Sequence, residues 1–426
     1  MSTQISEFEV SVVGALDSDA LVADLVALVE LPSITGTAEE SELQHRQAQS
    51  LRELGFSVDL WKLDLDDLAA QDGYPGMEVD RNEGYGVAAT LGGNDSPALV
   101  LQGHVDVVPT GDRDKWEDNN PFSGRIAGGA VHGRGACDMK AGLAVNMAIA
   151  RTIATLGLTL ERPLALHTVV GEEDGGIGAF ATMLRGHRGD AAVLTEPTSG
   201  RIITANAGAL TFALTVPGRA AHASMRLEGV SAIDAFWPIH LAIQRLEAER
   251  NANTPTRFLD TDLPFPISVG RLVAGDWSSS VADILVADGR LGVQLGEDPS
   301  EARAQFEAAV HQACQQDPWL RDNPAQVTWP GGQFASGMLN DDHPFIDEVS
   351  RSISALSEGF VPARAAAPYG SDLRLYSGVG GIPTLHYGPG DVRFAHAPRE
   401  QVQISELLTV ASSLLLLALR RCDAHS

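Results

Sequence analysis

The stretch Gly103-His104-Val105-Asp106 constrains this chain more than any other, because it follows directly on the apolar run at residues 98–101. Side chains alternate along a strand, so a His and an Asp two residues apart point the same way. If the apolar run is a buried strand, both side chains lie at the carboxyl edge of a sheet, where open α/β sheets bind ligands. Taken alone, the pair is more typical of a surface His beside a turn Asp, so its interpretation depends on later stretches.

Acidic residues follow two further apolar runs. Glu172, Glu173 and Asp174 come after the expected strand at 163–170, and Glu196 comes after the expected strand at 191–194. Three consecutive acids resist burial unless they are solvated or balanced by a cation. An acidic loop tip is the alternative interpretation of the first stretch.

Asp138 lies just before an expected helix at 140–156, where backbone N–H groups favour a carboxylate. On its own this residue is more typical of a helix N-cap than of a ligand. A second imidazole, His396, comes from the stretch Ala395-His396-Ala397-Pro398-Arg399-Glu400.

Together, these stretches direct a set of acids and imidazoles toward one edge of one sheet. Its members are His104, Asp106, Asp138, Glu172, Glu173 and Glu196, and His396 would supply the second imidazole that a two-metal site needs. So many carboxylates oppose each other's ionisation unless divalent charge is present. Carboxylate and imidazole ligands without thiolates favour zinc, cobalt or manganese in a hydrolytic site.

The order of expected elements predicts two domains, which suits a chain of 426 residues. Residues 1–207 and 337–426 alternate helices and strands, which predicts an α/β catalytic domain with a mixed sheet and helices on both faces. Residues 208–336 read as β-α-β-β-α-β, the ferredoxin-like order, and look like a small α+β domain inserted into the first.

The formal charge of −26 excludes partners that need a cationic surface, namely nucleic acids and anionic membranes. The longest apolar run, at 414–419, is far shorter than the roughly 20 residues that span a bilayer. Residues 1–10 lack the pattern of a secretory signal, and three scattered cysteines are too few for a disulfide framework. We therefore expect a soluble, cytoplasmic protein.

The ordered set of motifs resembles the M20 metallopeptidase family, and within it the acetylornithine deacetylase and succinyl-diaminopimelate desuccinylase branch. The stretches that carry the resemblance are Gly-His104-Val-Asp106, Gly-Arg-Gly-Ala-Cys-Asp138-Met-Lys, Glu172-Glu173, Thr-Glu196-Pro-Thr and Ala-His396-Ala-Pro-Arg-Glu. The resemblance spans nearly the whole chain, and the combination is specific although each stretch alone is not.

The resemblance implies two divalent ions, most commonly zinc, that share Asp138 and a bridging water. One ion would be held by His104, Asp138 and Glu196, and the other by Asp138, Glu173 and His396. Asp106 would orient His104, as metal-bound imidazoles usually require. Glu172 would be the general base that takes a proton from the water.

The resemblance also assigns the inserted domain to a lid that mediates homodimerisation. His222 would reach from this domain into the neighbouring subunit's site and stabilise the oxyanion. Arg290, Arg374 and Ser371 are weaker candidates for contacts with the substrate, the arginines because a guanidinium matches a carboxylate.

The reading that follows is a metal-dependent hydrolase that cleaves the amide bond of an N-acyl amino acid. A dipeptidase or carboxypeptidase of the same family is the alternative within this chemistry. An inactive metal-binding scaffold is the alternative from another class, and Glu172 argues against it, because a scaffold has no use for a base beside a metal.

Overall fold

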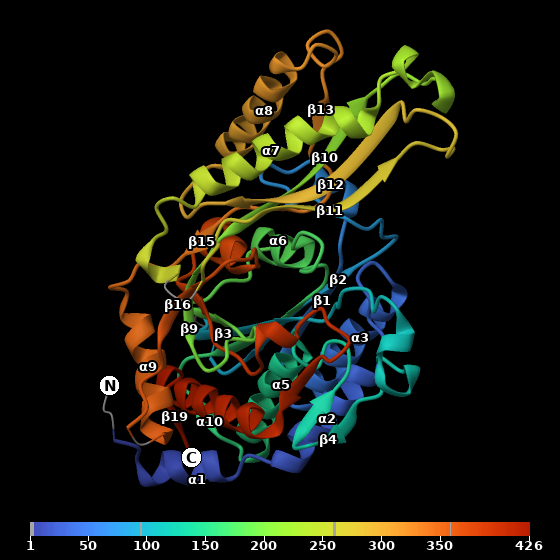
Figure 1. Ribbon diagram of the computed structural model, residues 1–426. Coiled ribbons are helices and arrows are strands. Elements are labelled where there is room, and N and C mark those ends of the chain that lie inside the picture. The colour runs from blue at the N-terminus through green and yellow to red at the C-terminus, as the bar shows by residue number, and fades with distance from the viewer. Residues whose placement is uncertain (1–3, 94–95, 259–260, 358) are drawn as a thin grey trace. The chain divides into compact units, whose positions relative to one another are not determined.

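The computed structural model describes residues 4–93, 96–258, 261–357 and 359–426, and it divides into two units (Figure 1). The first unit comprises Met1–Ala205, Met338–Ala365 and Asp372–Ser426, and the second comprises Asn206–Gly337 and Ala366–Ser371.

The short segment Ala366–Ser371 differs from the expected division, which placed it with residues 337–426. Two contacts explain why it lies with the second unit. The amide of Ala207 donates to the carbonyl of Ala367 at 2.9 Å, and Gly370 packs so closely on the side chain of Phe334 that a Cβ at residue 370 would lie 2.5 Å from Cβ of Phe334.

A mixed sheet forms the core of the first unit, as predicted. Within the described residues its strands lie in the order β1, β2, β7, β3, β8, β17, β9 and β15, with β16 beside β9. The central strands β7, β3, β8 and β17 are parallel to one another. The strands are β1 (Ser57–Lys62), β2 (Tyr85–Leu91), β3 (Leu99–His104), β7 (Leu164–Val169), β8 (Ala192–Leu194), β9 (Ile202–Asn206), β15 (Gly337–Met338), β16 (Arg364–Ala367) and β17 (Thr384–His386).

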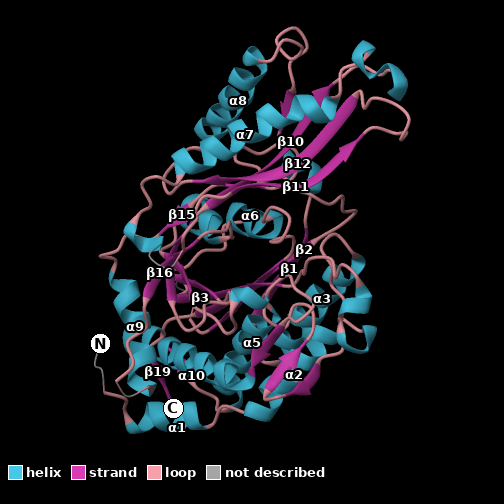
Figure 2. Cartoon of the chain, viewed as in Figure 1, coloured by secondary structure: helices cyan, strands magenta, loops and turns pink. Residues whose placement is uncertain are grey.

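Helices cover both faces of this sheet (Figures 1 and 2). Thr168 of β7 bonds to Gln44 of α3, and Gly103 at the paired position of β3 packs on α5. The next residue of β7, Val169, faces the other way and packs against α6. The helices of this unit are α1 (Glu7–Gly14), α2 (Ser18–Glu30), α3 (Ala38–Glu53), α4 (Leu65–Ala69), α5 (Lys140–Thr155), α6 (Ile177–Leu184), α9 (Pro344–Leu356) and α10 (Ile404–Arg421).

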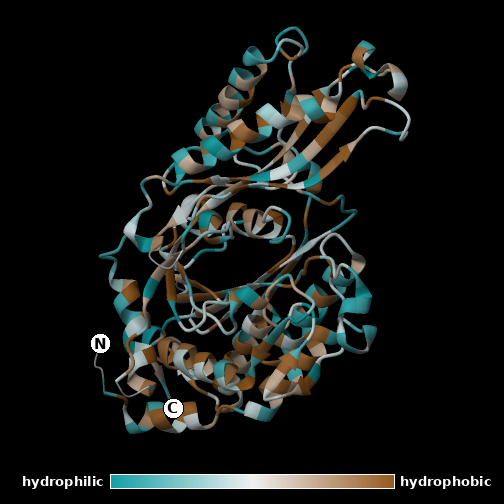
Figure 3. Cartoon of the chain, in the orientation of Figure 1, coloured by the Kyte–Doolittle hydropathy of each residue, from teal (hydrophilic) through white to brown (hydrophobic). Residues whose placement is uncertain are grey.

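Burial on both faces explains why the central strands read as continuous apolar runs. Every residue of β3, β7 and β8 is buried. Along the helix α9, by contrast, hydrophilic and hydrophobic residues are mixed (Figure 3). Two short antiparallel sheets complete the unit, β4 (Arg125–Ala127) with β5 (Ala130–His132) and β18 (Gln401–Gln403), and β6 (Thr159–Leu160) with β19 (Ala424–His425).

The second unit has the expected ferredoxin-like order of strands and helices. Its sheet is antiparallel with the order β11, β12, β10, β13, and β14 pairs with β10. Its elements are β10 (Gly208–Pro217), α7 (Ala232–Arg250), β11 (Ile267–Ala274), β12 (Ile284–Val293), α8 (Pro299–Gln316), β13 (Gln326–Thr328) and β14 (Gln333–Phe334). Burial alternates along β10, and Phe212 of this strand meets Phe306 of α8 with ring centroids 4.4 Å apart. The unit therefore has its own core.

The apolar run at 414–419 lies in α10, where its side chains are buried in the core of the first unit. Among the described residues, none of the helices combines the length and apolarity that crossing a membrane requires. The three cysteines are buried and form no disulfide.

Candidate metal centre

The ends of three parallel strands bring the predicted site residues together. His104 is the last residue of β3, Glu172 and Glu173 follow β7, and Glu196 follows β8. Since β3 pairs in parallel with both neighbours, the three strands end at one edge of the sheet. The expectation that these residues converge on one edge is met.

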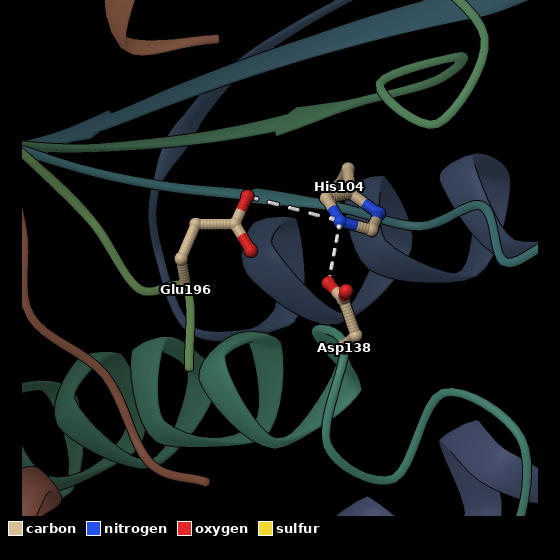
Figure 4. A group of neighbouring side chains, drawn as sticks. All are labelled: His104, Asp138 and Glu196. Atoms are coloured by element: carbon tan, nitrogen blue, oxygen red, sulfur yellow. Dashed lines mark ion pairs between the residues drawn. The ribbon is translucent and has the colours of Figure 1, made fainter. Parts of the chain in front are cut away.

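The first cluster consists of His104, Asp138 and Glu196, whose candidate ligand atoms all lie within 4.8 Å of one another. The Nε2 atom of His104 lies 3.3 Å from Oδ1 of Asp138 and 3.8 Å from Oε1 of Glu196, so the imidazole points between the two carboxylates (Figure 4). Asp138 does not cap α5, because Met139 occupies the N-cap position. Its carboxylate is turned to His104 instead.

The second cluster consists of Asp138, Glu173 and His396, within the same distance limit. The Nε2 atom of His396 lies 3.1 Å from Oε2 of Glu173 and 3.5 Å from Oδ2 of Asp138. Asp138 thus turns one oxygen toward each imidazole. Two groups that share one carboxylate suit a pair of metal ions with a bridging ligand.

Two buried atoms of the first cluster fit a metal ion. Across the described part of the chain, Nε2 of His104 and Oε1 of Glu196 are among the buried polar atoms that have no hydrogen-bond partner. A buried polar atom without a partner costs about 1–3 kcal/mol. An imidazole nitrogen and a carboxylate oxygen that face each other in this way are ligands that divalent zinc accepts.

The electrostatics of the clusters point the same way. Burial raises the pKa of Glu172 and of Glu196 well above the usual range, and neighbouring carboxylates raise both further. Burial lowers the pKa of His104, but Asp138, Glu196 and other acids outweigh it and raise this pKa well above its usual value. Glu173 raises the pKa of His396 to about 11. The buried carboxylates of the two clusters therefore need positive charge beside them. A divalent cation provides more of this charge than a single proton does.

Asp106 holds the site in a way that differs from the expectation. The Nδ1 atom of His104 lies 2.9 Å from the main-chain carbonyl of Asp106 but 3.7 Å from its carboxylate. The carboxylate is used elsewhere, because its two oxygens accept the backbone amides of Glu172 and Glu173 at 3.2 and 3.1 Å. Asp106 thus orients the imidazole through its backbone and the acidic loop through its side chain.

Glu172 is buried and belongs to neither cluster. Its Oε2 atom lies 3.9 Å from Nε2 of His104. A carboxylate beside the candidate ligands, with a raised pKa, is placed to exchange a proton with a water or a substrate there.

Glu400 is a positioning residue for which sequence reasoning assigned no role, although the motif around His396 contained it. One of its oxygens accepts the backbone amides of Gly135, Cys137 and Asp138 at 2.9–3.1 Å, and the other accepts from Arg134. The carboxylate thereby holds the loop that carries Asp138. An acid four residues after a candidate ligand was the available signal.

Three of the predicted substrate residues, His222, Arg290 and Ser371, belong to the second unit, and Arg374 belongs to the first. Arg374 is buried and donates to the carbonyl of Gly175 at 2.6 Å. Ser371 is buried in the second unit, and Arg290 of β12 lies 5.8 Å from the ring centroid of Phe334. His222 is exposed, and its Nδ1 atom lies 2.8 Å from Oγ of Ser224. Substrate contacts by these residues stay predictions.

Comparison with known proteins identifies relatives across almost the whole chain. The profile of peptidase family M20/M25/M40 matches residues 100–420. An N-formyl-4-amino-5-aminomethyl-2-methylpyrimidine deformylase from Halalkalibacterium halodurans is 26% identical, with 95% of this chain and 94% of the relative covered. An acetylornithine deacetylase from Shigella sonnei is also 26% identical, with 88% and 91% covered.

Among solved structures, human carnosine dipeptidase 1 has the same fold. Its TM-score to this chain is 0.76 at 14% sequence identity, and the match covers 98% of this chain and 99% of that one.

Proposed function

Because this chain belongs to peptidase family M20/M25/M40, whose profile matches residues 100–420, we propose that it is a dinuclear metal-dependent hydrolase that removes a small acyl group from an N-acyl amino acid or related amine. The observation that carries the proposal is the pair of clusters joined by Asp138, with Glu172 buried beside them. The two curated relatives, a deformylase and a deacetylase, support the acyl-removing form of this chemistry.

We assign the ligands as the clusters group them. His104, Asp138 and Glu196 would hold one ion, and Asp138, Glu173 and His396 the other. Zinc suits this set of ligands best, and cobalt or manganese also accept it. When bound, two such ions polarise an amide carbonyl and lower the pKa of water.

Glu172 then acts as the proton carrier of the reaction. Its carboxylate takes a proton from the attacking water while the water oxygen bonds to the carbonyl carbon. When the C–N bond breaks, the same carboxyl group returns the proton to the departing nitrogen. The products are a carboxylate and an amine.

Replacing Glu172 with Gln tests this assignment. Gln keeps the size of the side chain but cannot accept the proton, so we expect turnover to fall by about 10²–10⁴-fold. Metal content, measured by mass spectrometry of the purified protein, should stay near that of wild type. The exposed Glu161, which follows β6 and pairs with His425, offers a matched Glu→Gln control, which should keep full turnover. Wild-type turnover in the Glu172 variant would refute its role as the base.

The acyl group and the amine are identified with a panel of N-acetyl, N-succinyl and N-formyl amino acids and simple dipeptides, assayed with zinc, cobalt and manganese. Hydrolysis that requires the acyl group supports a deacylase. Hydrolysis of dipeptides with a free α-amine would assign the chain to the dipeptidase alternative instead.

We further propose a homodimer formed through the second unit, with His222 of each protomer serving the partner's site. Three apolar residues at helical spacing support a partner surface, since Ile233, Trp237 and Leu241 of α7 are 52%, 62% and 39% exposed. The exposed side chain of His222 can then act on the substrate of the neighbouring protomer.

A further inference from the structure

A buried group of charges lies behind the loop Gly171–Gly175, which carries Glu172. Its centre is Arg81, whose side chain is fully buried in the segment between α4 and β2. One end of its guanidinium donates to both oxygens of Asp174, at 3.1 and 3.2 Å, and to Oγ1 of Thr35 at 3.3 Å. The other end donates to both oxygens of Glu40, at 3.2 and 3.3 Å. A planar guanidinium suits two such bidentate contacts, which a lysine cannot make.

The partners of Arg81 hold the backbone around Glu172. The carboxylate of Glu40 accepts the amide of Gly171 at 3.2 Å. The hydroxyl of Thr35 lies 3.3 Å from Oδ2 of Asp106, the carboxylate that accepts the next two amides of the loop. Three consecutive amides of the loop are therefore held by two buried carboxylates. Arg81 contacts the carboxylate of Glu40, and its partner Thr35 contacts that of Asp106.

The loop and the guanidinium also fit each other closely. Gly171 has a φ of +66°, a conformation that favours glycine, and a Cβ at this residue would lie 2.7 Å from Nη2 of Arg81. The same Cβ would lie 2.9 Å from Oδ1 of Asp174. The guanidinium thus packs directly against the turn of the loop.

We propose that Arg81 is a positioning residue that sets the place of the Glu172 carboxylate through the backbone of the loop Gly171–Gly175. The inference rests on the proposed function, because it takes Glu172 to be the base. Without Arg81, the carboxylates of Glu40 and Asp174 face each other in a buried site with no cation between them. The loop then shifts to separate or solvate them, and a displaced base transfers protons poorly.

Substitution of Arg81 with Met and with Lys tests the positioning role. Met removes the charge and the hydrogen bonds of Arg81. We expect kcat to fall about 100-fold, because a displacement of a catalytic group by about 1 Å lowers the rate by about this factor. KM should change far less, because the substrate is bound by other residues. Lys keeps the charge without the two-sided geometry, so the kcat of this variant should lie between those of Met and wild type.

The decisive measurement combines Arg81→Met with Glu172→Gln, at saturating metal ion. If Arg81 acts through Glu172, the Met substitution lowers kcat no further once the base is gone. A general structural role would instead lower kcat by the same factor in both backgrounds. Arg420→Met is the matched control, since this mostly buried arginine pairs with Glu9 of α1 and should leave kcat unchanged.

The outcomes separate the two proposals. Full activity of Glu172→Gln would overturn the proposed function itself. Two other outcomes would overturn only the positioning role. In the first, Glu172→Gln lowers kcat strongly and Arg81→Met lowers it by the same factor with and without Glu172. In the second, Arg81→Met alone keeps the wild-type kcat. If the Met variant does not fold, Arg81→Lys and its combination with Glu172→Gln decide the question by the same comparison.

Discussion

Two buried arginine–glutamate pairs flank the candidate ligands. Arg81 with Glu40 holds the loop of Glu172, and Arg134 with Glu400 holds the loop of Asp138. In both pairs the glutamate accepts backbone amides, so charge and loop geometry are linked. Burial raises the pKa of Glu40 to about 8 and that of Glu400 to about 7, and in each pair the arginine opposes this rise.

Burial of neutral histidines predicts how stability depends on pH. His167 of β7 is buried, with Nδ1 2.9 Å from the hydroxyl of Tyr376, and burial lowers its pKa to about 3. Between this value and the ordinary pKa of 6.5, the unfolded chain binds a proton that the folded chain does not. Stability is therefore lost as pH falls below about 6.5.

Replacing His167 with Gln removes this titration. The free energy of unfolding is measured by urea denaturation between pH 5 and 6.5. As pH falls, it should decrease less steeply in the variant than in wild type, and the two slopes should differ by up to about 1.4 kcal/mol per pH unit. His311→Gln, at an exposed position of α8, is the control and should keep the wild-type slope. An unchanged slope in the His167 variant would show that this residue does not contribute.

At the scale of elements, the site depends on a very close approach between α5 and the end of β8. A Cβ at Gly142 of α5 would lie 2.1 Å from the carbonyl oxygen of Thr195, the residue before Glu196. The backbone of α5 can approach this strand end only because residue 142 has no side chain. Asp138 and Glu196 are held near each other by this contact.

Gly142→Ala should therefore move two candidate ligands apart. We expect the protein to lose about 1–3 kcal/mol of stability, as is typical of overpacking, and to bind metal ion more weakly in titrations of the metal-free protein. Gly14→Ala at the end of α1, where nothing lies within 4 Å of the added Cβ, should change neither property. Wild-type metal affinity in the Gly142 variant would contradict the expected role of this contact.

Elements with strong local patterns could be predicted from the sequence. The apolar runs of β3, β7 and β8 marked buried strands that end at one edge of the sheet, and the expected helix at 140–156 is observed as α5 (Lys140–Thr155). The helix α6 was missed because it has only eight residues and seven of them are buried, so it presents no polar face that would mark it as a helix.

The site shows the same limit. Strand ends followed by acids indicated which residues converge, because the geometry of a parallel sheet determines that edge. The roles of Arg81 and Glu40 depend on contacts between segments 41 residues apart, for which no local pattern exists. The use of the Asp106 carbonyl rather than its carboxylate toward His104 likewise follows from backbone geometry that the sequence does not display.

At the scale of the whole molecule, the second unit carries the surface that would join two protomers. Its strand β11 lies at the edge of the sheet and exposes Leu272 and Val273, and its helix α7 exposes an apolar stripe of Ile233, Trp237 and Leu241. An exposed sheet edge with apolar residues is a common site of pairing with another chain. The proposed dimer would cover both features.

Trp237→Glu tests the proposed dimer. A charge in the middle of the stripe should convert the dimer to a monomer in light scattering, because burying an unpaired carboxylate is costly. If His222 serves the partner's site, the monomer should keep its metal ions and lose turnover. Glu249→Gln, a change of charge at an exposed position near the end of α7, is the control, and a wild-type protein that is monomeric at assay concentrations would contradict the proposal.

The insertion of the second unit into the first has a consequence for the order of assembly during synthesis. Glu173 and His396 lie 223 residues apart in the sequence, and residues 206–337 are translated between them. The inserted unit is nearly continuous and has its own core, so it is able to fold before α9, β17, β18, α10, β19 and the candidate ligand His396 of the first unit have been made. A ribosome-bound chain that stops after residue 337 would therefore carry all of the insert except the short segment Ala366–Ser371, together with a candidate metal centre that lacks His396, and its hydrolytic activity would appear only when the last segment docks.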